Sequence, residues 1–257
     1  MMIILETKRL SIDFGGLKAL KGVDIQINEG DVFGLIGPNG SGKTTFFNLI
    51  TGFLKPTAGL VLYNGESITS LKPYEIAERG VIRTFQLTSL FPDLTSEENI
   101  IVGRYLKTKG NIWGAITRSK SYREEEAKAK KKAREILGFL GMEAKRTVLA
   151  RNLSFGDERK LEIGIALAAE PRLLLLDEPA AGMSPDESTK LMSLIRSIQM
   201  MGITVLIVEH NMRVVMELCS KIAVLNYGVK IAEGTPKEIA NNDEVTSVYI
   251  GRKDEDA

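Results

Sequence analysis

The chain has 257 residues, of which 44% are hydrophobic and 26% are charged, and this composition excludes a disordered or fibrous protein. Its 34 Lys and Arg residues balance 33 Asp and Glu residues, which excludes a field of one sign that would attract nucleic acid or anionic lipid. The single cysteine, Cys219, excludes an internal disulfide and favours a reducing compartment, and no apolar run reaches the ~18 residues of a membrane span.

Short apolar runs punctuated by Gly, Pro and Asn predict strands, and the longer amphipathic segments predict helices. The expected strands are 4–14, 19–27, 32–36, 60–63, 80–85, 173–176, 204–208 and 222–225. The expected helices are 43–51, about 119–140, 185–200, which Pro185 begins, and 212–219. Because strands and helices alternate again after Pro171, the sequence predicts an α/β fold with a parallel-sheet core.

The sequence from about Gln86 to Ala168 differs from the rest of the chain because no strand pattern occurs there. A helix with mixed charges from Arg123 to Glu135 dominates it, and the pattern favours a solvated helix face. The only tryptophan, Trp113, lies in a Gly-containing segment predicted to be a loop, where it either packs or makes family-specific contacts. This region therefore reads as an inserted helical lobe.

A glycine-rich segment between a predicted strand and a predicted helix fits the phosphate-loop pattern G-x-x-x-x-G-K-[ST]. Its residues are Gly37, Pro38, Asn39, Gly40, Ser41, Gly42, Lys43 and Thr44, and Thr45 follows them. Its glycines let backbone N–H groups converge on phosphates at a helix N-terminus. Lys43 would reach the β- and γ-phosphates of a nucleotide, and Thr44 would ligate Mg²⁺.

Two carboxylates follow the apolar run that begins at Leu173. Asp177 would hold Mg²⁺, and Glu178 would orient and deprotonate an attacking water. An apolar run that ends in Asp-Glu is as often structural when it stands alone. Together with the phosphate loop, the pair predicts nucleotide hydrolysis.

The segment Leu153-Ser154-Phe155-Gly156-Asp157 precedes this strand, and with it the chain resembles the ATP-binding cassette (ABC) ATPases, whose diagnostic segment is LSGGQ. The resemblance implies that Ser154 and Gly156 face the γ-phosphate of ATP bound to an opposite subunit. Phe155 and Asp157 depart from the family pattern. Ser154 also fits a helix N-cap, and both interpretations are compatible.

Three further site residues come from this resemblance. Gln86 corresponds to the loop glutamine that contacts metal and water, and His210, the only histidine, corresponds to the switch histidine at the γ-phosphate. Phe14 corresponds to the aromatic residue that stacks on adenine, although a Phe at a strand end more often packs in the core. The implied ligands are ATP and Mg²⁺.

The resemblance covers nearly the whole chain and implies a single ATPase domain over residues 1–257. Residues 1–86 and 169–238 would form the catalytic core with an antiparallel β region, 87–168 the helical subdomain, and 239–257 a C-terminal helix and tail. Three stretches are similar to ATPase subunits of LIV-type branched-chain amino-acid importers: Arg83-Thr-Phe-Gln with Leu90-Phe91-Pro92, the insertion around Trp113, and Leu161-Glu-Ile-Gly through Asp177 to Gly182. The C-terminal segment that includes Val248-Tyr-Ile-Gly251 adds to this resemblance.

The importer resemblance implies a peripheral protein at the cytoplasmic face of the membrane. It would act as a homodimer or a heterodimer with a related ATPase, bound to transmembrane permease subunits, with a solute-binding protein as an indirect partner and no nucleic acid. The alternatives are an ATPase of lipopolysaccharide or other lipid export, a soluble non-transport ABC ATPase, and a nonhydrolytic assembly module. Glu178 and His210 argue against the last of these.

Overall fold

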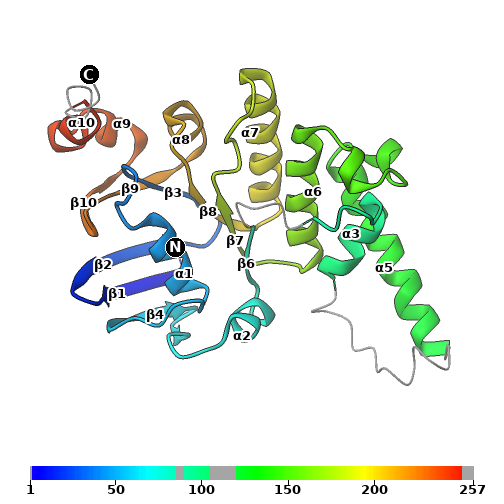
Figure 1. Ribbon diagram of the computed structural model, residues 1–257, viewed down its shortest axis with the longest axis horizontal. Helices are drawn as coiled ribbons and strands as arrows, with labels where there is room; N and C mark the ends of the chain where they lie inside the picture. The colour runs from blue at the N-terminus through cyan, green and yellow to red at the C-terminus, as the bar shows by residue number, and fades with distance from the viewer. Residues whose placement is uncertain (1, 85–89, 105–119, 251–257) are drawn as a thin grey trace. The chain divides into compact units, whose positions relative to one another are not determined.

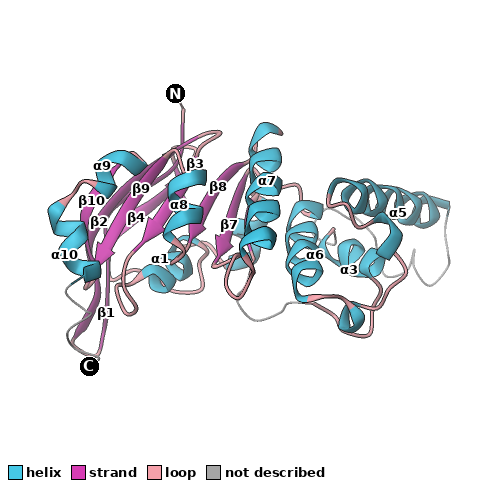
Figure 2. Ribbon diagram, turned by 90° about the horizontal axis from the view of Figure 1, so that it is seen from above, coloured by secondary structure: helices cyan, strands magenta, loops and turns pink. Residues whose placement is uncertain are grey.

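The computed structural model describes residues 2–84, 90–104 and 120–250. The chain forms two compact units: a first unit of Met1–Arg83 and Arg172–Ala257, and a second unit of Thr84–Pro171 (Figure 1). The described part of the second unit consists of helices and loops, whereas both β-sheets belong to the first (Figure 2).

One sheet of the first unit is antiparallel and has the strand order β2-β1-β4-β5. Its strands are β1 (Ile3–Phe14), β2 (Leu17–Asn28), β4 (Ala58–Tyr63) and β5 (Glu66–Ser67). In β2, buried Val23, Ile25 and Ile27 alternate with exposed neighbours, as expected for a strand with one face on the core. The strands expected at 4–14, 19–27 and 60–63 are confirmed.

The other sheet has six strands in the order β10-β9-β3-β8-β7-β6. They are β3 (Val32–Ile36), β6 (Val81–Arg83), β7 (Leu173–Asp177), β8 (Thr204–Val208), β9 (Lys221–Asn226) and β10 (Val229–Gly234). Strands β6, β7, β8, β3 and β9 pair in parallel, and every residue of β3, β7 and β8 is buried, which explains their unbroken apolar runs. The predicted α/β fold with a parallel core is confirmed, and β10 adds an antiparallel edge strand that the sequence did not predict.

The helices of the first unit are α1 (Lys43–Ile50), α2 (Pro73–Glu78), α7 (Pro185–Met200), α8 (Met212–Leu218), α9 (Pro236–Ala240) and α10 (Asp243–Ile250). Fully buried Phe46 and Phe47 hold α1 in the same apolar core as Phe33 of β3. Pro185 begins α7 as predicted, behind a capping box of Ser184 and Glu187. Cys219 is buried just after α8, and burial raises the pKa of its thiol to about 12.

The second unit contains α3 (Ser96–Gly103), α5 (Lys120–Phe139) and α6 (Phe155–Ala168), with short 3₁₀ turns at Glu143–Lys145 and Ala150–Asn152. Helix α5 buries Ala133 and Leu137, while its exposed side carries ion pairs such as Glu126–Lys130 at 2.7 Å. The predicted solvated face of this helix is confirmed. No helix within the described ranges is both long enough and apolar enough to span a bilayer.

Candidate functional site

Three loops of the first unit meet at the carboxyl edge of the six-stranded sheet. Strand β3 leads into the segment that begins at Gly37, β7 ends at Asp177, and β8 leads to His210. The register pairs Val208 with Leu35 on one side and with Asp177 on the other, so these three strands end side by side. In open α/β sheets this edge is where ligands bind. Motifs far apart in the sequence therefore converge at one place.

The loop from Gly37 to Gly42 has a conformation that needs glycine at both ends. Gly37 has φ +151°, and a Cβ atom there would lie 2.1 Å from the Leu225 carbonyl oxygen. Gly42 has φ +106°, and its Cβ atom would lie 2.7 Å from Leu20 Cδ2. A side chain at either position would displace the backbone, which accounts for the glycine pattern found in the sequence.

Lys43 begins α1, and its side chain folds back on the loop. Its Nζ donates to the carbonyl oxygens of Gly37 at 2.7 Å and Pro38 at 3.0 Å, and the residue is only 7% exposed. The first turn of α1 carries no acidic residue, so the positive end of the helix is not neutralised locally. A buried ammonium group next to a helix N-terminus favours an anionic ligand.

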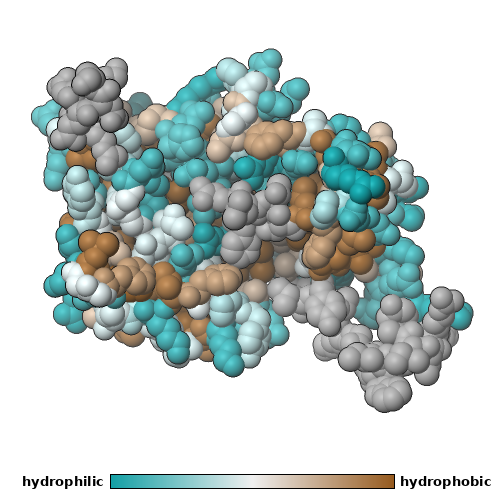
Figure 3. Space-filling model, viewed as in Figure 1, coloured by the Kyte–Doolittle hydropathy of each residue, from teal (hydrophilic) through white to brown (hydrophobic). Residues whose placement is uncertain are grey.

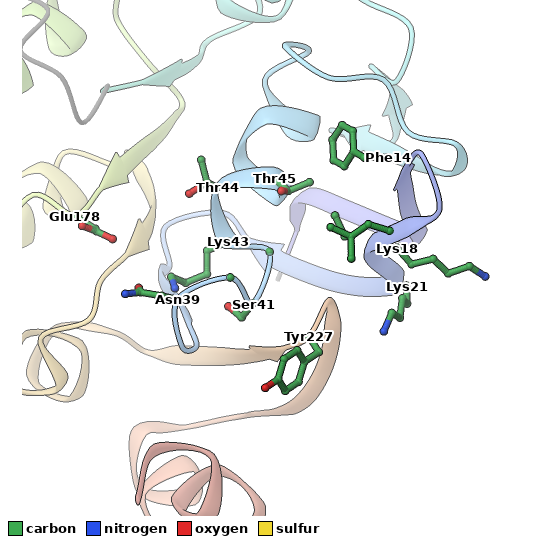
Figure 4. A pocket seen from close by; sticks show the side chains of 14 residues that line it. Phe14, Lys18, Lys21, Asn39, Ser41, Lys43, Thr44, Thr45, Glu178 and Tyr227 are labelled. Carbon is green, nitrogen blue, oxygen red and sulfur yellow. The ribbon is translucent and has the colours of Figure 1, made fainter. Parts of the chain in front are cut away.

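A cavity of about 430 Å³ lies over this loop (Figure 4). Lys18, Lys21 and Lys43 give its wall positive charge, and Glu178 lies on the side of the loop facing β7. Apolar side chains are exposed nearby on the β1–β2 turn, where Phe14 and Leu17 are 45% and 70% exposed. Figure 3 shows that apolar residues also reach the surface of the first unit on the side seen in Figure 1. The complete lining is Phe14, Leu17, Lys18, Ala19, Lys21, Asn39, Gly40, Ser41, Gly42, Lys43, Thr44, Thr45, Glu178 and Tyr227.

Asp177 is held by a residue to which the sequence analysis gave no role of its own. Arg83 Nη2 donates to Asp177 Oδ2 at 2.7 Å, while its Nη1 donates to Asn48 Oδ1 at 2.6 Å. The guanidinium carbon also lies 5.4 Å from the centre of the Phe47 ring. The other carboxylate oxygen, Asp177 Oδ1, is buried and has no hydrogen-bond partner in the described part of the chain. The ion pair with Arg83 orients this oxygen. A carboxylate oxygen without a partner is a suitable ligand for a bound cation.

Glu178 has a left-handed backbone conformation with φ +49°, which costs a non-glycine residue about 1 to 3 kcal/mol. Its N–H donates to the Val208 carbonyl oxygen at 2.8 Å, which ties the turn after β7 to the end of β8. His210 Nδ1 lies 3.8 Å from Glu178 Oε2, and the two side chains are 61% and 24% exposed. The carboxylate and the imidazole therefore face each other near the loop of Gly37.

Ser154 is the N-cap of α6 in the second unit, as the sequence predicted. Its hydroxyl accepts from the Asp157 N–H at 3.3 Å and donates to Asp157 Oδ2 at 2.6 Å. Although burial raises the pKa of the Asp157 carboxyl, hydrogen bonds from Lys145 and Ser154 hold it below its ordinary value. Gly156 lies in the first turn of α6. The predicted residues Gln86 and Trp113 lie outside the described residues.

Residues 20–181 match the profile of the family described as ABC transporter, and this stretch includes the loop of Gly37, Ser154, Gly156 and the Asp177–Glu178 pair. The chain belongs to the ABC transporter family. It is an ATP-binding cassette that couples ATP hydrolysis to transport. Residues 229–255 of the cassette match a second profile, described as branched-chain amino acid ATP-binding cassette transporter.

Curated relatives resemble the cassette over almost its full length. The high-affinity branched-chain amino acid transport ATP-binding protein BraF of Pseudomonas aeruginosa is 39% identical over 249 residues, which are 96% of this chain and 98% of BraF. LivG of Escherichia coli, which carries the same description, is 38% identical over 249 residues, with 96% and 98% covered.

Solved structures agree with the fold of the cassette. The ADP conformation of an ABC transporter cassette superposes with a TM-score of 0.86 at 36% identity, covering 98% of this chain and all (100%) of that chain. A nucleotide-free cassette gives 0.85 at 35% identity, with 96% and 99% covered. A dimeric bacterial ABC transporter cassette gives 0.76 at 28% identity, with 91% and 99% covered.

Proposed function

We propose that this cassette energises the import of branched-chain amino acids. The observation that carries the catalytic part of the proposal is the convergence of the phosphate loop, the Asp177–Glu178 pair and His210 at one edge of the parallel sheet. The substrate class rests on BraF and LivG and on the match of residues 229–255. The ATPase itself need not contact the amino acid.

ATP would lie in the cavity over the phosphate loop. Phe14 stacks on the adenine ring, and the backbone from Gly37 to Thr45 surrounds the phosphates. Lys43 moves its ammonium from the carbonyl oxygens of Gly37 and Pro38 to the β- and γ-phosphates. The partial exposure of Phe14 and the buried position of Lys43 support these roles.

The residues present fit Mg²⁺. Asp177 offers the buried oxygen that lacks a partner among the described residues, and the Thr44 hydroxyl is exposed at the start of α1. Gln86 is the third proposed ligand. When bound with ATP, Mg²⁺ neutralises charge on the β- and γ-phosphates.

Glu178 accepts the proton of the attacking water and His210 contacts the γ-phosphate as the leaving bond breaks. Their separation of 3.8 Å leaves both side chains next to the same small volume. General-base assistance of this kind contributes about 10²- to 10⁴-fold to a rate. The strained backbone of Glu178 supports a functional role, because such strain concentrates at active sites.

The complete site would include a second cassette, either another copy of this chain or a related ATPase, whose Ser154 and Gly156 approach the γ-phosphate. The similarity to a dimeric bacterial cassette supports this arrangement. Transmembrane permease subunits would hold the pair at the cytoplasmic face of the membrane, and a solute-binding protein would deliver the amino acid to them.

The test is Glu178→Gln in the full-length chain. We expect ATP binding to be retained, turnover to fall at least about 100-fold, and an ATP-dependent dimer to accumulate on size-exclusion chromatography. The same variant, used as bait with MgATP present, should retain a permease. This permease, reconstituted with the wild-type cassette, should take up labelled leucine. A monomeric variant with full turnover would sink the catalytic proposal, and a permease that takes up only another substrate would sink the importer assignment.

A further inference from the structure

Glu209 is a fully buried carboxylic acid that the roles above do not use. It lies between the end of β8 and His210, and its exposure is 0%. A buried acid is costly to keep unless it makes hydrogen bonds, so its partners indicate what it does. Burial raises the pKa of its carboxyl, and hydrogen bonds from backbone N–H groups act in the opposite direction.

The carboxylate of Glu209 joins two loops of the site. Its Oε1 accepts from the N–H of Ala180 at 2.7 Å, in the loop after β7. Its Oε2 accepts from the N–H groups of His210 at 3.2 Å and Asn211 at 3.3 Å, in the loop after β8. One side chain therefore fixes the backbone on both sides of the gap between Glu178 and His210.

These bonds act on the turn that orients Glu178. The turn begins with the Glu178 N–H bonded to Val208, and it closes with the Ala181 N–H donating to the Glu178 carbonyl oxygen at 3.1 Å. Ala180, inside this turn, is the residue that Glu209 holds. A residue with φ +49° persists only when its surroundings impose that conformation, and the Ala180–Glu209 bond is part of those surroundings.

We propose that Glu209 is a positioning residue that holds the Glu178 turn and the His210 loop at the separation needed for attack on the γ-phosphate. The inference rests on the roles proposed for Glu178 and His210. It predicts an effect on the rate of the chemical step rather than on ATP binding, because the bonds of Glu209 are to backbone groups beyond the phosphate loop. A misplacement of about 1 Å in such a site can cost about 100-fold in rate.

The test is Glu209→Gln. A glutamine side chain has one acceptor oxygen and one NH₂ donor. The NH₂ group must then face the backbone N–H donors of one of the two loops, and the hydrogen bonds to that loop are lost. We expect kcat for ATP hydrolysis to fall about 10- to 100-fold, with less than about a threefold change in KM. The matched control is Thr204→Val at the other end of β8, where the Thr204 hydroxyl is equally buried and accepts from the Gly30 N–H at 2.9 Å. This control should lower the melting temperature and leave kcat unchanged.

A second measurement separates positioning from a general loss of structure. In the Glu178→Gln background, Glu209→Gln should cause a smaller loss of the residual rate than it does in the wild-type chain, because one of the two groups that it positions is already absent. If Glu209→Gln alone does not fold, Glu209→Asp, which keeps the charge but shortens the side chain, replaces it in both measurements with the same expectation. Unchanged kcat, or a loss that adds fully to that of Glu178→Gln, would overturn the inference. Full turnover by Glu178→Gln alone would instead contradict the proposed function.

Discussion

Asp177 ends a strand whose residues are all buried, and Glu178 follows it directly, whereas Ser154 precedes its helix at an exposed position. In the first unit, neighbouring strands position the side chains of the proposed site. The residues that contact these side chains, such as Arg83, are buried. In the second unit the supports of Ser154 are local: its own helix turn and Lys145. Substitutions at the site of the first unit should therefore alter ATP binding by the isolated cassette, whereas substitutions around Ser154 should act only when two cassettes meet.

The largest expected effect is that of Lys43→Ala. The substitution removes a buried cation, and each hydrogen bond from such a group to a charged ligand contributes about 1.5 to 3 kcal/mol. The affinity for labelled ATP should fall at least about 100-fold in an equilibrium titration. Lys18→Ala, which removes an exposed cation from the wall of the same cavity, should change it less than about fivefold. Comparable affinities for the two variants would contradict the role of Lys43.

Two buried ion pairs allow the units to be compared directly. Arg83 pairs with Asp177 in the first unit, and Arg159 pairs with Glu162 at 2.9 Å in the second. Arg83→Met and Arg159→Met each leave a buried carboxylate without its cation, so each should lower the free energy of unfolding by about 3 kcal/mol in urea titrations. Only Arg83→Met should also change the Mg²⁺ concentration that supports half-maximal hydrolysis. A changed Mg²⁺ requirement for Arg159→Met but not for Arg83→Met would contradict this prediction.

A smaller effect is expected for two partly exposed aromatic residues. Phe14→Ala should weaken ATP binding by up to about tenfold, because aromatic stacking contributes about 0.5 to 1.5 kcal/mol. Phe155, in the first turn of α6, is similarly exposed and lies under the Arg159 guanidinium at 5.1 Å from its ring centre. Phe155→Ala should leave ATP binding by the isolated cassette unchanged, and both variants can be measured in the titration with labelled ATP. Equal losses would remove Phe14 from the adenine site.

The smallest expected change is in stability and comes from backbone strain. Glu178 and Glu170, which follows α6, have φ +49° and +54°. Each glycine variant should melt about 3 °C above the alanine variant at the same position, because glycine adopts this conformation without strain of about 1 kcal/mol and both variants lose the glutamate side chain. The alanine variants are the reference, since alanine keeps the strain and, at position 170, also loses the ion pair with Arg104. Glu178→Gly should lose ATP hydrolysis and Glu170→Gly should keep it, so only one of the two strained residues would serve catalysis.

The sequence was sufficient where the signal is local. The spacing of the glycines predicted the loop of Gly37. Unbroken apolar runs predicted β7 and β8, because a strand covered on both faces has no position that faces solvent. The role of Arg83 could not be predicted, because its partner Asp177 lies 94 positions away and only the pairing of β6 with β7 joins them. Glu209 looks like a solvent-exposed strand end in sequence, and β10 lacks the alternation that identifies a strand.

The buried thiol of Cys219 has a practical consequence. As the only cysteine in the chain, it lies in the first unit, and its high pKa keeps it in the unreactive thiol form while that unit is folded. A thiol-reactive dye would then label the native protein only when the region around β3 and α8 opens. The rate of labelling therefore measures how often the nucleotide-binding unit opens, and no probe has to be engineered into the chain.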